Sequence, residues 1–213
     1  TEWLLFNLLD FDYACEALIP EQYRESGDGK LHLGQMAYDA VVVPGMITMR
    51  ATTLQALQAF HRAGGKVIFM GRVPSYVDGV PSDKVKEFAS CCHKIGYEKY
   101  ALLDALQPHR DVEIQKGDGL RSDRLIYQLR RDGQDRWLFI AQGKPDDRLE
   151  LSHWVSQTGR EDFTVRVRGT FEAENFDANT GRVSPVQVLH EKGWTVIKLS
   201  GSTICTKNPE KGQ

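Results

Sequence analysis

Apolar residues in the first half of the chain alternate between the spacing of strands and the spacing of helices. Residues 38–43 end in an uninterrupted run of valines, which is typical of a parallel strand buried on both faces. Residues 52–63 place their large apolar side chains on one helical face, and residues 66–71 form a second buried strand. A further helix is predicted to open at Pro81 and Ser82. This order predicts an α/β domain with a parallel sheet covered by helices on both sides.

The N-terminal residues have the pattern of a helix rather than of a strand. Residues 3–9 are mostly apolar at helical spacing. Because a doubly wound sheet normally starts with a strand, we expect a truncated sheet of about three to four strands. Its open edge would lie beside residues 41–43 or 67–70 and would favour self-association. Thr52 or Thr53 is the expected cap of the helix that follows the first buried strand.

The second half of the chain changes to short alternating runs separated by turns. Residues 125–129 and 137–140 flank a turn at 132–133, which is the signature of a β-hairpin. Residues 163–168 alternate strictly, with the apolar side chains predicted inside and the arginines outside. Many short strands without a helical window predict an all-β antiparallel sandwich. The remaining strands are expected at residues 171–176, 186–189 and 194–199.

The change of pattern sets the expected domain boundaries. Helical periodicity is lost after Leu106, and turn-bounded alternation starts at Leu125. We therefore expect an α/β domain over residues 1–115 and a β-sandwich domain over residues 120–208.

Composition narrows the classes of partner. The chain has 213 residues, of which 41% are hydrophobic and 26% are charged, as in globular proteins with a substantial core. Its formal net charge is −2, so neither nucleic acid nor a membrane surface is an expected partner. No segment approaches the roughly 18 consecutive apolar residues of a membrane span.

The best carboxylate pair close in sequence is Asp10 and Asp12. If their segment is extended, both side chains point to one side, which suits the acid and base of glycoside hydrolysis. The alternative, which we favour, is that both residues cap the short helix that follows and fix a loop. Glu172 and Glu174 also share a strand face, where a solvated outer surface accounts for them.

Cofactor and metal sites often have recognisable sequence motifs. The sequence contains no GxGxxG and no Walker motif. No cysteine follows the strand at 66–71, where a class I glutamine amidotransferase would need its nucleophile. The six histidines are scattered, so no metal ligand set and no cofactor is expected. The cysteines are expected to be ordinary thiols, with one structural disulfide as the alternative: Cys15, Cys91, Cys92 and Cys205.

The four tryptophans are candidates for stacking on sugar rings. Trp137 and Trp194 lie in alternating strands and are therefore expected in the core. Trp154 lies in a polar stretch, residues 152–157, where a sugar contact and a structural role are equally open. Asp10, Asp12 and Trp154 are thus the candidate substrate-binding residues.

Five segments of the chain carry a family resemblance: residues 3–5, 10–16, 38–45 and 64–71, and the Asp-x-x-Thr-Gly turn at 177–181. They resemble segments of large bacterial multidomain glycoside hydrolases related to α-L-rhamnosidases. In those enzymes a catalytic barrel precedes an amidotransferase-like α/β domain, which is similar to the trimerisation domain of some β-galactosidases, and a β-sandwich follows. The resemblance implies a flavodoxin-like or amidotransferase-like sheet, truncated here, and places the catalytic carboxylates in the barrel.

The leading hypothesis is therefore a pair of non-catalytic accessory domains that support a catalytic barrel or an oligomer interface. The implied partners are a carbohydrate bound through the parent enzyme, the catalytic domain and a second copy of the chain. One alternative is an independent carbohydrate-binding module that uses the sandwich. Another is a small-molecule enzyme that uses the α/β switch point. The parent could be a cytoplasmic or a secreted bacterial protein.

Overall fold

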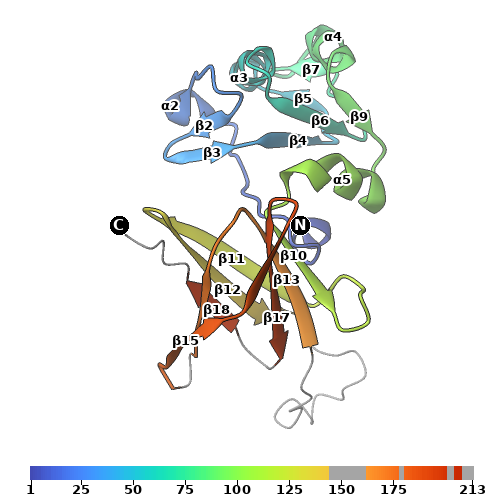
Figure 1. The fold of residues 1–213 in the computed structure, drawn as a ribbon. Helices are drawn as coiled ribbons and strands as arrows, with labels where there is room; N and C mark the ends of the chain where they lie inside the picture. The colour runs from blue at the N-terminus through green and yellow to red at the C-terminus, as the bar shows by residue number, and fades with distance from the viewer. Residues whose placement is uncertain (144–161, 178–179, 201–203, 208–213) are drawn as a thin grey trace. The chain divides into compact units, whose positions relative to one another are not determined.

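The computed structural model describes residues 1–143, 162–177, 180–200 and 204–207. The chain divides into two compact units. The α/β unit comprises Asp12–His109, and the β unit comprises Thr1–Phe11 together with Arg110–Gln213. Figure 1 traces the elements of both units along the chain.

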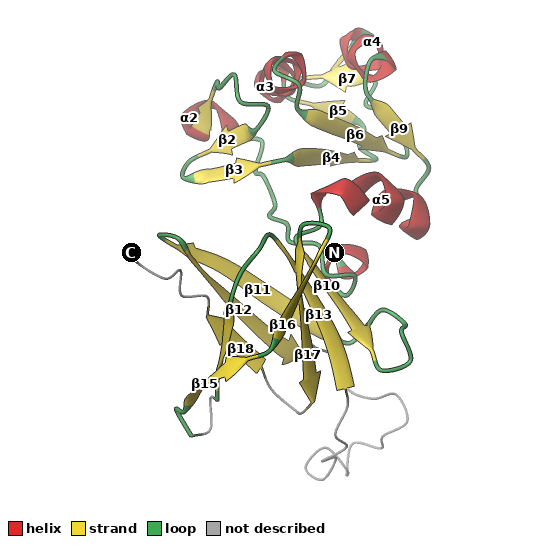
Figure 2. Cartoon of the chain, viewed as in Figure 1, coloured by secondary structure: helices red, strands yellow, loops and turns green. Residues whose placement is uncertain are grey.

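The α/β unit is built on a three-stranded parallel sheet with the strand order β4-β6-β9. Figure 2 shows helices α3 and α4 over one face of this sheet and α5 over the other. This layered arrangement confirms the α/β class predicted from the sequence. The main elements are β4 (Ala40–Pro44), α3 (Ala51–Arg62), β6 (Lys66–Met70), α4 (Lys84–Ser90), β9 (His93–Ile95) and α5 (Lys99–Leu106).

Strand β6 is buried on both faces, as its uninterrupted apolar run predicts. Val67 and Phe69 belong to a core cluster that includes Phe60 of α3 and Phe88 of α4. Ile68 points to the opposite face and is also fully buried. A strand between two helical layers has no solvent-facing side, so every position can be apolar.

Strand β4 forms one edge of the sheet, and its valines, residues 41–43, lie at that edge. Residues 67–70 belong instead to the central strand. Among the described residues, no strand pairs with the outer side of β4. The sheet therefore has the small size expected for a truncated α/β layer.

The start of α3 differs from the expectation. The N-cap residue is Arg50, which makes no capping bond through its side chain, and Thr53 is buried within the helix. The cap comes from outside the helix, because the Ala51 N–H donates a hydrogen bond of 3.1 Å to the Asp78 carboxylate. A carboxylate at this position satisfies an otherwise unpaired N–H and complements the helix dipole.

The end of α3 depends on two glycines. Gly64 has a φ of +92°, a conformation that favours glycine. A Cβ atom on Gly65 would lie 2.0 Å from the buried Phe60 ring, so the chain can pass only without a side chain. The end of α3 at these residues is thus a steric requirement of the core.

Short elements surround the sheet. One small antiparallel sheet has the order β1-β2-β3, and a mixed one has the order β5-β7-β8. Both small sheets are formed by segments that precede or connect the main elements. Their bounds are α2 (Ile19–Gln22), β1 (Tyr23–Arg24), β2 (Leu31–Leu33), β3 (Met36–Tyr38), β5 (Thr48–Met49), β7 (Tyr76–Val77), β8 (Val80–Pro81) and the 3-10 helix η1 (Gln107–His109).

The β unit is a sandwich of two antiparallel sheets, which confirms the second part of the predicted fold class. The four-stranded sheet contains, in order, β10 (Val112–Lys116), β13 (Asp162–Arg168), β17 (Trp194–Ser200) and β16 (Val188–Glu191). The five-stranded sheet contains, in order, β11 (Leu125–Asp132), β12 (Asp135–Gln142), β18 (Ile204–Lys207), β14 (Ala173–Phe176) and β15 (Val183–Val186).

The sandwich core is filled from both sheets. Ile114 and Val165 of the four-stranded sheet share one buried cluster with Leu138 and Ile140 of the five-stranded sheet. Leu8 completes this cluster and is fully buried. The arginines of β13 point away from the core, as the alternation of residues 163–168 predicts.

The two units differ from the expected domains at both ends of the α/β unit. Strand β10 starts at Val112, so the all-β part begins earlier than residue 120. Residues 1–11 belong to the β unit because Leu8 packs in its core. Helix α1 spans only Glu2–Leu5, and Leu8 has a φ of +57°, so the predicted helix over residues 3–9 is too long.

Candidate functional site

Asp10 lies in a polar network that joins the N-terminal segment to β11. Burial, and then the negative charges of Asp10 and Asp111, raise the pKa of the Tyr127 hydroxyl. The backbone N–H of Asp10 donates a hydrogen bond to that hydroxyl. A phenol with a raised pKa stays protonated at neutral pH, so Tyr127 does not serve as a base there.

Arg110 holds the same segment. Its side chain is buried, and Nη1 donates to the carbonyl oxygens of Asn7 and of Leu8, the latter at 3.0 Å. Burial, and then the charge of Arg121, lower the pKa of Arg110 to about 10, which leaves the guanidinium charged at neutral pH. These bonds satisfy two carbonyl groups that follow the end of α1 and have no partner within that helix.

Asp12 has a different role in the α/β unit. Its exposed carboxylate accepts a hydrogen bond of 2.8 Å from the Tyr38 hydroxyl at the end of β3. This contact fixes the start of the unit to the strand that leads into β4. Helix α2 has Leu18 as its N-cap residue and no capping bond from a side chain.

The three predicted substrate-binding residues therefore have separate positions. Asp10 belongs to the β unit and Asp12 to the α/β unit, and each contacts a tyrosine of its own unit. Trp154 lies outside the described residues. The Asp12 carboxylate thus has a local partner in Tyr38, whereas Asp10 contacts Tyr127 through its backbone.

The carboxyl ends of the parallel strands are the usual ligand position of an open α/β sheet. Here the three strands lead into Gly45, Gly71 and Gly96. A Cβ atom on Gly45 would lie 3.3 Å from the backbone nitrogen of Arg72, and the Gly71 N–H donates to the Ile95 carbonyl at 2.9 Å. Backbone atoms of neighbouring loops therefore fill the space between these strand ends.

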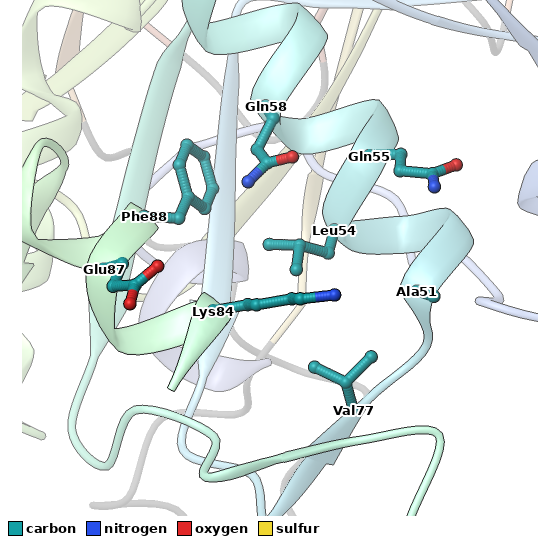
Figure 3. A pocket seen from close by; sticks show the side chains of 8 residues that line it. All are labelled: Ala51, Leu54, Gln55, Gln58, Val77, Lys84, Glu87 and Phe88. Atoms are coloured by element: carbon teal, nitrogen blue, oxygen red, sulfur yellow. The ribbon is translucent and has the colours of Figure 1, made fainter. Parts of the chain in front are cut away.

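A small pocket of about 230 Å³ lies instead between α3, α4 and β7 (Figure 3). Its apolar lining includes Leu54, Val77 and Phe88. Lys84 and Glu87, both exposed, contribute charged groups to its lining. An apolar lining with exposed charged side chains beside it is typical of a surface groove. In a catalytic centre, by contrast, the charged groups are usually shielded from solvent.

The remaining candidate chemistry is sparse in the described part of the chain. No group of three or more His, Cys, Asp or Glu side chains is arranged there to hold a metal ion. None of its helices is long and apolar enough to cross a membrane. Cys15, Cys91 and Cys92 are free thiols, and burial, followed by the neighbouring Cys91, raises the pKa of Cys92 to about 11. A thiol of this kind is a poor nucleophile.

Two tryptophans that were expected in the core lie on the outer sides of the sandwich. Trp137 alternates with the buried Leu138, so the two side chains point to opposite faces of β12. Ile197 of β17 is a core residue, and Trp194, three positions earlier in the same strand, therefore points to the outer face. The Arg168 guanidinium lies 4.7 Å from the centroid of the Trp194 ring. Both rings are partly exposed.

Sequence comparison and structure comparison give different information about this chain. No protein-family model and no curated protein sequence matches it. The fold, in contrast, is similar to part of a rhamnosidase from Novosphingobium sp. PP1Y, with a TM-score of 0.63 and 18% identity. That match covers 92% of this chain and 19% of the rhamnosidase.

Two further structures have a similar fold. The alpha-L-fucosidase isoenzyme 2 of Paenibacillus thiaminolyticus matches 99% of this chain with 44% of its own, at a TM-score of 0.59 and 11% identity. The apo exo-carrageenase GH42 of Bacteroides ovatus matches 99% of this chain with 26% of its own, at a TM-score of 0.51 and 15% identity. The chain therefore has the fold of a stretch found within glycoside hydrolases, and it spans less than half the length of each.

Proposed function

We propose that this chain forms non-catalytic accessory domains of a glycoside hydrolase, which support the catalytic domain or an oligomer interface. One observation carries the proposal: an α/β unit and a β-sandwich, in this chain order, match one stretch of a rhamnosidase over 92% of the chain. The same arrangement is similar to part of a fucosidase and part of a carrageenase.

The contacts of the candidate carboxylates support a structural role for both. Hydrolysis of a glycoside normally needs two carboxyl groups about 5 to 10 Å apart across the scissile bond. Asp12 accepts a hydrogen bond from Tyr38 through its carboxylate, and Asp10 donates one to Tyr127 through its backbone N–H. Each residue therefore helps to hold its own segment in place. The catalytic carboxylates are then expected elsewhere in the enzyme.

The exposed edge of β4 supports a role in assembly. An edge strand presents unpaired N–H and C=O groups that can pair with another strand. Val42 on this edge strand is only partly buried, while Val43 is buried in the core. We expect this edge to receive a strand of the catalytic part or of a second copy.

The native polypeptide provides the most direct test of the proposed function. Antibodies raised against this chain are used to isolate the protein from the organism that produces it. The account expects a polypeptide well above 24.1 kDa that hydrolyses glycosides after isolation. A native polypeptide of about this mass without glycosidase activity would contradict it.

A second test uses the purified chain alone. We expect no turnover of aryl α-L-rhamnosides or aryl α-L-fucosides. Turnover that is abolished by Asp10→Asn or Asp12→Asn would instead show that the chain contains the catalytic pair.

A further inference from the structure

The five-stranded sheet of the β unit turns aromatic side chains outward. Leu138 and Ile140 of β12 are buried in the sandwich core, so Trp137 and Phe139 face the other way. Phe139 is 48% exposed, which is unusual for a phenylalanine in a central position of a sheet. Together with Phe176 of β14, these residues form a surface that we name the aromatic platform.

Two rings of the aromatic platform, those of Trp137 and Phe176, contact each other although another strand lies between their own strands. Strand β18 lies between β12 and β14, so the backbones that carry Trp137 and Phe176 are separated by about 10 Å, or two strand spacings. Their ring centroids are nevertheless only 5.2 Å apart, with an angle of 55° between the ring planes. Both side chains therefore lean toward each other, so that their rings are in contact.

Polar side chains border this surface at the same levels of the sheet. On β11, Arg130 pairs with Trp137 and Gln128 with Phe139, and both polar residues are exposed. On the other side, Glu174 of β14 is at the level of Trp137, because both pair with the same residue of β18. These three residues offer hydrogen-bond donors and acceptors, and Arg130 and Glu174 carry opposite charges.

We propose that the aromatic platform binds a neutral pyranose ring. One face of such a ring consists of C–H groups, which are attracted to the negatively charged face of an aromatic ring. Its edge consists of hydroxyl groups, which can bond to Arg130, Gln128 and Glu174 around the platform. The opposite charges of Arg130 and Glu174 match a neutral ligand better than a polyanion or a cation.

The arrangement of the rim favours a sugar over a protein surface. Stable protein interfaces bury about 800 Å² on each partner, and the centre of the buried patch is depleted of charged residues. Here a charged or amide side chain stands one strand away from each aromatic residue of β12. Such close alternation fits a small ligand that combines apolar and polar groups.

The inference rests on the proposed function, since a glycoside hydrolase meets sugars as substrate and product. It goes further by assigning a sugar contact outside any catalytic centre. The proposed function fails if the native polypeptide carries no glycosidase activity, whereas the aromatic platform is tested by binding to the chain itself. The two failures are therefore distinguishable.

The test is a ligand-observed NMR titration of the purified chain with methyl α-L-rhamnopyranoside and methyl α-L-fucopyranoside. A ligand of this size on an open surface is expected to bind with a Kd on the order of 1 to 10 mM. Trp137→Leu should weaken binding about fivefold or more, because it removes the larger ring of the pair. Trp194→Leu, on the outer face of the other sheet, is the matched control and should bind as the unmodified chain does.

Three results would overturn the proposal. The first is no binding of either glycoside up to about 50 mM, well above the expected Kd. The second is binding that Trp137→Leu leaves unchanged although the variant is folded by circular dichroism. The third is sedimentation as a dimer that Trp137→Leu dissociates and that neither glycoside affects, since a second copy would then occupy the platform.

Discussion

The two sheets of the β unit share one core and differ in the side chains that they turn outward. On the four-stranded sheet, Arg166 of β13 lies opposite Glu113 of β10 and 3.4 Å from the Glu191 carboxylate of β16. On the five-stranded sheet, the outward positions of β12 hold Trp137 and Phe139. The pleat decides which residues face outward, and their chemistry decides whether the face is a solvated surface or a binding surface.

Each outer face also contains one tryptophan in a different setting. The Arg168 guanidinium lies over Trp194, and the same side chain donates to the Arg110 carbonyl through Nε at 2.9 Å. Trp137 lies beside Phe176, ring to ring. The Trp194 indole thus takes part in a network with a cation, whereas the Trp137 indole is in contact with a second aromatic ring.

The largest effect is expected inside the sandwich, where β12 separates core from surface at consecutive positions. Leu138→Ala should lower the free energy of unfolding by about 3 kcal/mol, because the buried side chain leaves a cavity. Phe139→Ala should lower it by less than about 1 kcal/mol, since this ring faces outward. Denaturant titration followed by tryptophan fluorescence measures both, because all four tryptophans belong to the β unit.

Equal costs at these two positions would contradict the assigned faces of β12. The comparison needs no assumption about function, since both variants are measured in the same strand and by the same signal. It therefore tests the geometry on which the aromatic platform depends.

A smaller loss is expected from Arg168→Met on the four-stranded sheet. The substitution removes the hydrogen bonds to the Arg110 carbonyl, so the free energy of unfolding should fall by about 1 to 2 kcal/mol. Trp194 should become more exposed, with a red shift of its fluorescence. Arg168→Lys should restore the charge but not the forked contact, and full recovery in that variant would argue against the network.

The smallest effect concerns the ion pair between Arg166 and Glu191. Both side chains are substantially exposed, so Glu191→Gln should cost no more than about 0.5 kcal/mol. Because salt screens exposed charges, the difference from the unmodified chain should vanish in concentrated sodium chloride. A loss that persists at high salt would show that the face is more than a solvated ionic surface.

Much of the fold could be predicted from the sequence, because its signals were local. The apolar run of β6 and the strict alternation of β13 each define how many faces of a strand are buried. The valines of β4 predicted burial on both faces, which is wrong, because β4 is an edge strand in which only Val43 is buried. The glycines after α3 likewise indicate where that helix stops. These patterns need no knowledge of distant residues.

Long-range contacts explain the features that were missed. The cap of α3 comes from Asp78, far along the chain from Ala51. The segment after the short N-terminal helix is held by Arg110, which donates hydrogen bonds to the carbonyl oxygens of Asn7 and Leu8. Neither contact has a signature in the local sequence.

The outward position of Trp137 was missed for a different reason. Strand β12 reads Trp-Leu-Phe-Ile at residues 137–140, so both of its faces are apolar. Alternation then gives no indication of which face is buried. The two faces are distinguished by their neighbours on β11, because Trp137 and Phe139 pair with the polar Arg130 and Gln128. These pairs can be identified only when the register of the hairpin is known.

The most direct test of the account is protein-observed NMR of the four tryptophan indole groups during titration with methyl α-L-rhamnopyranoside. The account predicts that the indole N–H signal of Trp137 moves in a saturable manner while that of Trp194 stays in place. Equal movement of both signals, or movement of the Trp194 signal alone, would contradict a sugar-binding platform on the five-stranded sheet.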